Sequence, residues 1–144
     1  LIYQNKFDEA RATIAEGRTY NPNSGEFYIL EAKIAENQKD FSACSEAYQN
    51  ALRNNYKTVT TYAGLSRCLR LSGLLDPADT ILESGFADHG TGAAPLVLEK
   101  AHIEKEKNNR AAAIYQYEQY LLLMPNDPQR SEIENIINVL KNSR

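Results

Sequence analysis

The sequence predicts an all-α protein built as a solenoid, in which similar pairs of helices stack side by side. Three observations predict this architecture: a period of about 34 residues, small residues at fixed places within the period, and glycine and proline between the periods. Ala10, Cys44, Ala78 and Ala113, for example, follow one another at steps of 34, 34 and 35 residues. Each unit of such an array is too small to bury its apolar face alone, so we expect the units to bury theirs against one another.

The period divides the chain into about four units and a closing helix. We expect a partial first unit at 1–24, complete units at 25–58, 59–93 and 94–127, and a capping helix at 128–144. The unit at 59–93 contains a longer loop with glycines. The sequence begins at Leu1 without an initiator methionine, part-way through the first helix of a unit, so we expect a fragment of a longer chain.

Aspartates mark three expected helix starts. Asp40 is expected to cap a helix that runs to about Asn54, because a carboxylate at this place accepts hydrogen bonds from free backbone N–H groups. Asp76 and Asp127 are each followed by a proline, which fits the first position of a helix. The sequence therefore predicts caps at all three aspartates.

The last segment and one connection differ from the regular units. Between residues 131 and 141, Ile133, Ile136, Ile137 and Leu140 fall three and four residues apart on one helical face, which suits a helix that covers the end of the stack. Residues 85–92 contain three glycines and are expected to form a loose connection that holds the extra residue. A phosphate-binding loop there would need a preceding strand and a following lysine, and both are missing, which favours a simple turn between units.

Catalytic and metal chemistry find little support in the sequence. Cys44 and Cys68 are 24 residues apart, without the close pairs typical of zinc sites, and we expect both to be small core residues that pair or not. His89 and His102 have no partners that the sequence can place, and no nucleophile or dinucleotide motif appears. We therefore expect no enzyme activity, no metal site and no cofactor.

The register resembles that of the tetratricopeptide repeat (TPR) family over nearly the whole chain. In that family, small residues recur at positions 8, 20 and 27 of the unit and aromatic residues at positions 4, 17 and 24. Position 4 here holds Tyr28, Tyr62 and Val97, position 8 holds Ala32, Ser66 and Ala101, and position 24 holds Ile14, Tyr48, Leu82 and Tyr117. The chain departs from the pattern at position 7, with Glu31 and Lys100 in place of leucine, at position 27, with the large Tyr120, and in lacking tryptophan. The resemblance implies a right-handed superhelical solenoid that acts as a protein-interaction scaffold.

The nine tyrosines are expected to divide between core and surface. Four of them occupy places that normally pack between helices: Tyr28, Tyr48, Tyr62 and Tyr117. Tyr115 lies outside the usual core positions and Tyr56 lies in a turn, so these two are the better candidates for contact with a partner.

In TPR proteins the first helix of each unit lines a concave groove. Carried onto this chain, the resemblance implies eight candidate partner-binding residues in that groove: Ile29, Lys33, Ala63, Arg67, Arg70, Leu98, His102 and Lys105. The four basic residues would form a stripe suited to a peptide or partner helix with acidic groups, and the apolar residues would hold its side chains. The alternative is a solvated face whose charge is offset by Glu26, Glu36, Glu104 and Glu106.

Other partners and roles are weaker on this sequence. The carboxylate clamp of chaperone-binding TPR domains is absent, since its five positions hold Ile29, Lys33, Gly64, Pro95 and Glu99. A net charge of −3 argues against nucleic acid, and no apolar or basic amphipathic segment points to a membrane. The alternative function is a structural module for self-assembly or spacing, so a homo-oligomer stays open, and the compartment is unknown.

Overall fold

The computed structural model describes residues 2–22 and 24–143, with side chains from Lys6 onward; Leu1, at which the expected first unit begins, lies outside the described residues. This part of the chain contains α-helices and no strand. The helices are α1 (Ile2–Tyr20), α2 (Gly25–Asn37), α3 (Phe41–Arg53), α4 (Val59–Leu71), α5 (Leu75–His89), α6 (Ala94–Glu106), α7 (Arg110–Leu123) and α8 (Arg130–Asn142).

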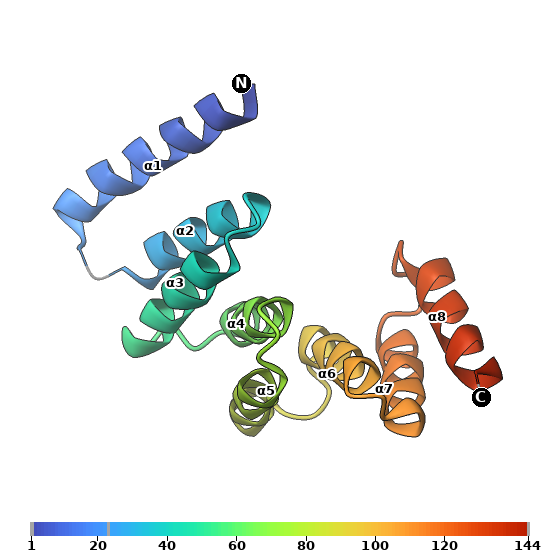
Figure 1. Ribbon diagram of the computed structural model, residues 1–144. Coiled ribbons are helices and arrows are strands. Elements are labelled where there is room, and N and C mark those ends of the chain that lie inside the picture. The colour runs from blue at the N-terminus through green and yellow to red at the C-terminus, as the bar shows by residue number, and fades with distance from the viewer. Residues whose placement is uncertain (1, 23, 144) are drawn as a thin grey trace.

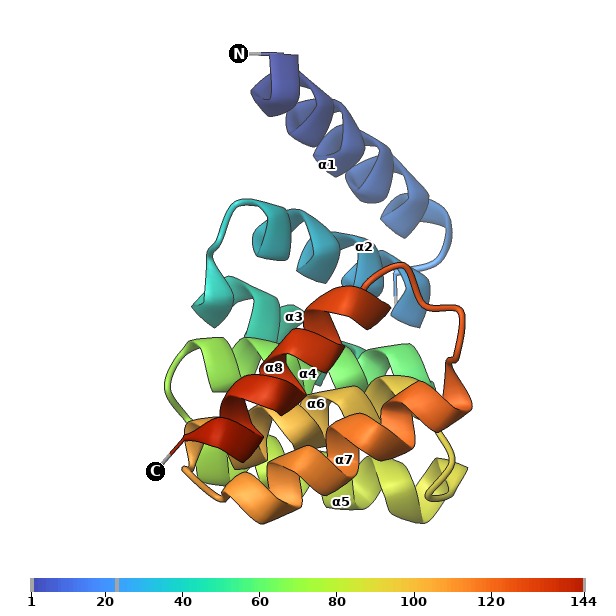
Figure 2. The same ribbon diagram turned by 90° about the vertical axis from the view of Figure 1, so that its right-hand side faces the viewer.

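The helices stack as pairs into a right-handed superhelical solenoid that curves around a hollow (Figure 1). Helices α2, α4 and α6 follow one another along the inner side, and α3 and α5 lie outside them. Helices α1 and α8 stand at opposite ends, and a turn of the view by 90° shows α1 projecting beyond the packed pairs (Figure 2). The inner helices are therefore the ones that present side chains to the hollow.

Helix caps agree with the sequence prediction at one aspartate and differ at two. The Asp40 carboxylate accepts a hydrogen bond from the Ala43 N–H at 3.1 Å and caps α3, as predicted. The prediction was wrong at Asp76, which lies inside the first turn of α5 and pairs with Lys107 at 3.0 Å. Asp127 accepts a hydrogen bond from the Gln129 N–H at 2.7 Å in the turn before α8, so it shapes the turn without being the cap residue.

The connection expected at 85–92 is shorter than predicted, because α5 continues to His89. Two contacts hold this last turn: the Tyr62 hydroxyl donates to Asp88, and His89 Nε2 lies 2.6 Å from the Lys57 carbonyl oxygen. The turn begins only at Gly90, whose φ of 87° favours glycine. Tertiary contacts thus extend the helix across a segment that composition alone suggests is loose.

Small residues at the predicted positions sit at the centre of the solenoid. Ala32, Cys44, Ala78, Ala101 and Ala113 are all fully buried, which allows neighbouring helices to approach closely. This pattern confirms the register of the array across α2 to α7.

The closing helix and the tyrosines behave mostly as expected. On α8, Ile133 and Ile137 are buried and Ile136 and Leu140 are half-buried in the same apolar cluster, which confirms the predicted face. Of the tyrosines expected in the core, three are buried and Tyr28 is half-buried. Tyr56, offered as a contact candidate, instead packs on the core beside α2.

The start of the chain is one continuous helix. We expect the chain to begin part-way through the first helix of a unit, and residues 2–20 form one uninterrupted helix. No glycine or proline occurs between residues 2 and 16 to end a helix there.

Candidate functional site

Five charged side chains of the inner helices form one connected set, here called the inner ion-pair network. Glu36 of α2 accepts hydrogen bonds from Arg67 of α4 at 2.6 Å (Nη2) and 3.2 Å (Nε). Arg67 Nη1 lies 3.6 Å from Glu99 of α6, to which Arg70 Nε donates at 3.3 Å. Arg70 Nη1 also donates to Glu106 at 2.8 Å. The network joins the inner helices of three successive pairs.

Glu99 is the centre of this network and is only 5% exposed. Burial raises the pKa of its carboxyl group, while the positive charges of Arg70 and Arg67 act in the opposite direction. An ionised carboxylate at this depth needs paired, hydrogen-bonded partners, and the two guanidinium groups supply them. Glu99 in turn fixes where these two side chains lie.

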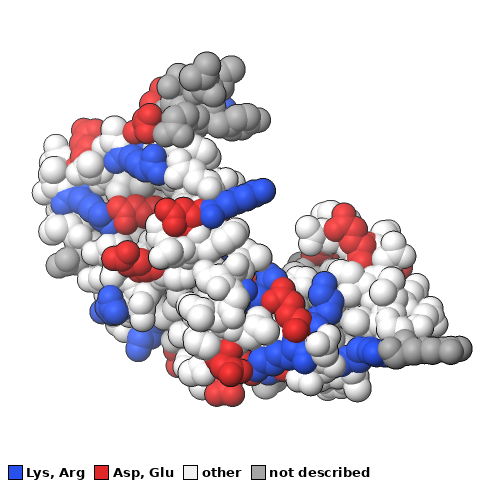
Figure 3. Space-filling view, viewed as in Figure 1, with Lys and Arg blue, Asp and Glu red and all other residues white. Residues whose placement is uncertain are grey.

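The basic stripe expected from the sequence is therefore largely neutralised. Arg67 and Arg70 have carboxylate partners, whereas no ion pair among the described residues includes Lys33 or Lys105. Figure 3 shows acidic and basic side chains next to one another on the wall of the hollow. The two lysines are the cations of the predicted stripe that lie outside the network.

The carboxylates that offset the stripe are only partly those named from the sequence. Glu36 and Glu106 pair with arginines of the stripe, but Glu104 pairs with Lys100 at 3.0 Å. Sequence reasoning missed Glu99, which it noted only as a residue that does not fit the clamp. Its position was nevertheless informative, since it is an acid on the inner helix that follows one with Arg67 and Arg70.

The expected apolar residues differ in how accessible they are. Ile29 and Ala63 are buried in core clusters and offer little surface to a ligand. Leu98 is half-buried, and Leu71, a further apolar residue near the end of α4, is exposed. The apolar surface available in the hollow is therefore smaller than the sequence suggests.

His102 joins α6 to its paired helix α7. Its Nδ1 lies 2.7 Å from the Tyr117 hydroxyl oxygen, and the two rings meet edge to face. Burial lowers the pKa of His102 to about 4, helped by the nearby charges of Arg70, Lys105 and Arg67. A neutral imidazole at this place supports the helix pair and offers the hollow no positive charge at neutral pH.

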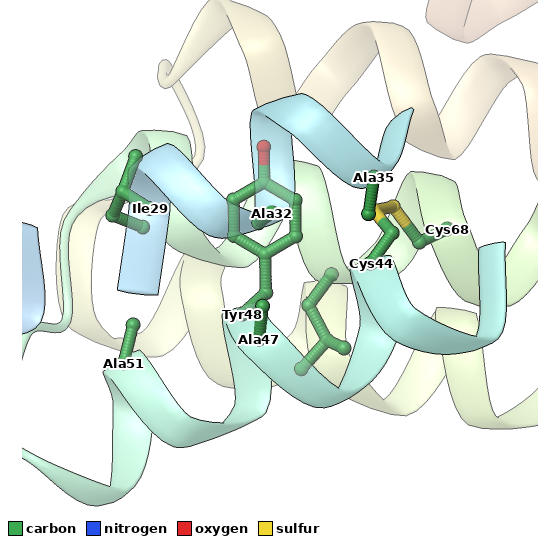
Figure 4. Packing of buried hydrophobic residues seen from close by; sticks show 9 residues of the cluster. Ile29, Ala32, Ala35, Cys44, Ala47, Tyr48, Ala51 and Cys68 are labelled. Atoms are coloured by element: carbon green, nitrogen blue, oxygen red, sulfur yellow. A yellow bond between two sulfur atoms is a disulfide. The ribbon is translucent and has the colours of Figure 1, made fainter. Parts of the chain in front are cut away.

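Two cysteines that lie 24 residues apart in the sequence are neighbours in the fold. Cys44 of α3 and Cys68 of α4 are both fully buried and form a disulfide between neighbouring pairs of helices (Figure 4). Cys68 Sγ lies 3.7 Å from Oε1 of Glu36, which also accepts the Tyr48 hydroxyl at 2.7 Å. Glu36 thus connects the inner ion-pair network to the two sulfur atoms.

A cavity of about 680 Å³ lies outside this site, between α1, α2 and α3. Its floor is apolar, with Ile14, Ile34, Ala35 and Ala47, and its rim carries charges of both signs: Arg11, Arg18, Glu31, Asp40 and Glu46. Helix α1 packs less closely on α2 than α3 does, which leaves this space between them.

No family model matches the sequence, and no curated protein matches it significantly. Within the described residues, no helix has the length and apolar character needed to cross a bilayer.

The solved structures with a similar fold include two that match over most of this chain. One is the Arabidopsis OM64 TPR domain, with a TM-score of 0.71 and 13% identity over 79% of this chain and 93% of that one. The other is a chain of the APC/C hetero-tetramer Cut9–Hcn1, with a TM-score of 0.78 and 20% identity over 94% of this chain and 27% of that one. The chain has a TPR-like fold.

Proposed function

We propose that this chain is a protein-interaction scaffold that captures an extended peptide or a partner helix in the hollow lined by α2, α4 and α6. The observation that carries this proposal is the inner ion-pair network, which fixes charged side chains across three successive inner helices. Side chains held in place before binding lose little conformational freedom when a partner arrives.

The network leaves hydrogen-bonding capacity for a partner with acidic groups. A guanidinium group has five N–H donors, and no described hydrogen bond uses Nη2 of Arg70. Lys33 on α2 and Lys105 on α6 add positive charge without ion-pair partners among the described residues. A partner carboxylate would bind these groups, and Leu71 and Leu98 would contact its apolar side chains.

Charge reversal of the two lysines tests this proposal without breaking the network. We expect the Lys33→Glu, Lys105→Glu double variant to keep its helicity by circular dichroism and to lose at least 10-fold in recovery of the partner from lysate of the source organism. The matched control is Lys39→Glu with Lys57→Glu, which makes the same charge change in two turns outside the inner helices. Equal recovery by both double variants would refute capture in the hollow.

A second candidate function, self-assembly, is favoured by an exposed apolar face of α7. Tyr115 is 58% exposed and Leu122, seven residues further on the same helical face, is 75% exposed. Leu123 and Met124 extend this apolar surface at the end of the helix. No large apolar residue is exposed on α3 or α5.

Sedimentation equilibrium tests this second candidate. Self-assembly through α7 predicts an average mass that rises with protein concentration, and a Leu122→Glu variant that stays monomeric over the same range. A wild-type chain that is monomeric at all concentrations would exclude this role for the α7 face.

A further inference from the structure

Three metal-binding side chains converge where α2, α3 and α4 meet. Glu36, Cys44 and Cys68 each offer one ligand atom, and the three atoms lie within 4.8 Å of one another. Both cysteines are fully buried, and Figure 4 shows their sulfur atoms enclosed between helices. The Cα atoms of the cysteines are 6.1 Å apart, so the two thiols reach the same point in space without backbone movement.

We propose that this cluster, once its disulfide is reduced, is a binding site for Zn²⁺ with two thiolate ligands and one carboxylate ligand. Thiolate sulfur and carboxylate oxygen are both zinc ligands, and two thiolates select zinc over the hard cations Mg²⁺ and Ca²⁺. The sequence spacing of 24 residues argued against such a site. In the structure, the solenoid brings an outer helix and the next inner helix into contact at these two cysteines.

The surroundings of the cluster balance the charge of a bound ion. Two thiolates and a carboxylate carry three negative charges, of which Zn²⁺ neutralises two. Arg67, hydrogen-bonded to Glu36 at 2.6 Å and 3.2 Å, places a positive charge next to the remaining negative one and shares it with Glu99. The Tyr48 hydroxyl also donates to Glu36, so the ligating carboxylate is oriented by two outer partners, as in established zinc sites.

Only the reduced form of the cysteine pair can bind zinc. In the disulfide, both sulfur atoms are bonded to each other and neither is a thiolate. A dithiol reductant breaks the S–S bond by supplying two electrons and two protons, and is itself oxidised to a cyclic disulfide. Zinc binding then releases the two thiol protons to solvent and joins both thiolates to the ion.

Cobalt is a suitable spectroscopic probe for the full chain. After reduction with a dithiol and anaerobic removal of the reductant, we expect one Co²⁺ per chain to give a near-ultraviolet thiolate-to-cobalt band, which one equivalent of Zn²⁺ removes. The oxidised chain should give no such band. A reduced chain with neither the band nor a rise in melting temperature on addition of Zn²⁺ would overturn the proposal.

Variants identify the ligands. Cys44→Ser and Cys68→Ser should each abolish the band, with circular dichroism showing that helicity remains. Glu36→Gln removes a direct ligand, so it should weaken Zn²⁺ binding by at least about 10-fold, the lower end of the loss seen for outer-shell partners. The matched control is Glu106→Gln, which removes another carboxylate of the inner ion-pair network but none near sulfur, and should bind like the wild type. Wild-type affinity in Glu36→Gln would rule out the three-ligand site.

Discussion

Helices α3 and α4 pack closely against each other, and we call this a closed junction. Helices α1 and α2 pack loosely beside a cavity, and we call this an open junction. The two junctions use the same position of the repeat in different ways: α4 places the buried Leu65 there, and α2 places Glu31, which pairs with Arg18 of α1 at 2.7 Å. The closed junction also carries the Cys44–Cys68 disulfide. The open one borders the cavity of about 680 Å³.

The open junction is also less completely hydrogen-bonded. Nε and Nη2 of Arg18 are buried without a hydrogen-bond partner among the described residues, and its guanidinium lies over the Tyr28 ring at 4.5 Å. Lys100, at the same repeat position as Glu31, makes a better paired junction, with Asp79 of α5 at 2.6 Å and Glu104 at 3.0 Å. The repeat fixes which positions meet, while the side chains at those positions decide how closely the helices pack.

The largest expected contrast comes from two glycines that each face an aromatic ring. A methyl group at Gly64 would overlap the Tyr48 ring, and one at Gly17 would overlap the Phe27 ring. Tyr48 is buried and its hydroxyl is held by Glu36, so Gly64→Ala should lower the free energy of unfolding by about 3 kcal/mol. Phe27 is only half-buried and meets Gly17 with the far end of its ring, so Gly17→Ala should change the free energy of unfolding by less than about 1 kcal/mol. Urea unfolding measures both, and equal losses would contradict the distinction between the two junctions.

Reduction of the disulfide should act on the closed junction alone. With a chelator present to remove metal, reduction should lower the free energy of unfolding by about 3 kcal/mol, since the disulfide closes a loop of 24 residues. Hydrogen exchange should show the loss of protection first in α3 and α4. A Cys44→Ala, Cys68→Ala variant is the control, and any response of this variant to the reductant would show that the effect arises elsewhere.

Lowering the pH should destabilise the packing of α6 on α7 through protonation of His102. The α1–α2 junction contains no part of this contact and should not respond to it. The folded-state pKa of His102, at about 4, lies below its ordinary value of 6.5, so the unfolded chain takes up the proton first as the pH falls. The stabilisation is present above about pH 6.5 and is lost progressively towards pH 4, with about 2 kcal/mol lost between pH 7 and pH 5. His102→Gln should remove this part of the pH dependence, and an unchanged slope in urea titrations would exclude His102 as its source.

The smallest effect is expected at the ion pair of the open junction. Glu31→Ala should cost less than about 1 kcal/mol, because Glu31 and Arg18 are both partly solvent-exposed. The loss should shrink further in 1 M salt, where the Debye length is about 3 Å. A cost above about 2 kcal/mol that salt does not change would mean that the α1–α2 junction is as tightly built as the other.

The candidate site was predicted less completely than the fold. The sequence located Arg67, Arg70 and the lysines through the repeat register, but it presented them as a basic stripe, whereas Glu99 and Glu36 pair with the two arginines. Ion pairs between helices depend on side-chain reach across an interface, which the period alone does not contain. The same reason explains why Asp76 pairs with Lys107 when local sequence suggested a cap.

The sequence by itself determined the all-α class, the period, the small positions at the helix crossings and the apolar face of α8, because these follow from local helix geometry repeated along the chain. Only the tertiary structure decided the contacts between residues distant in sequence. It extended α5 to His89 through Tyr62 and Lys57, and it joined Cys44 to Cys68. These contacts depend on how closely neighbouring units approach, and that distance is set by packing in three dimensions.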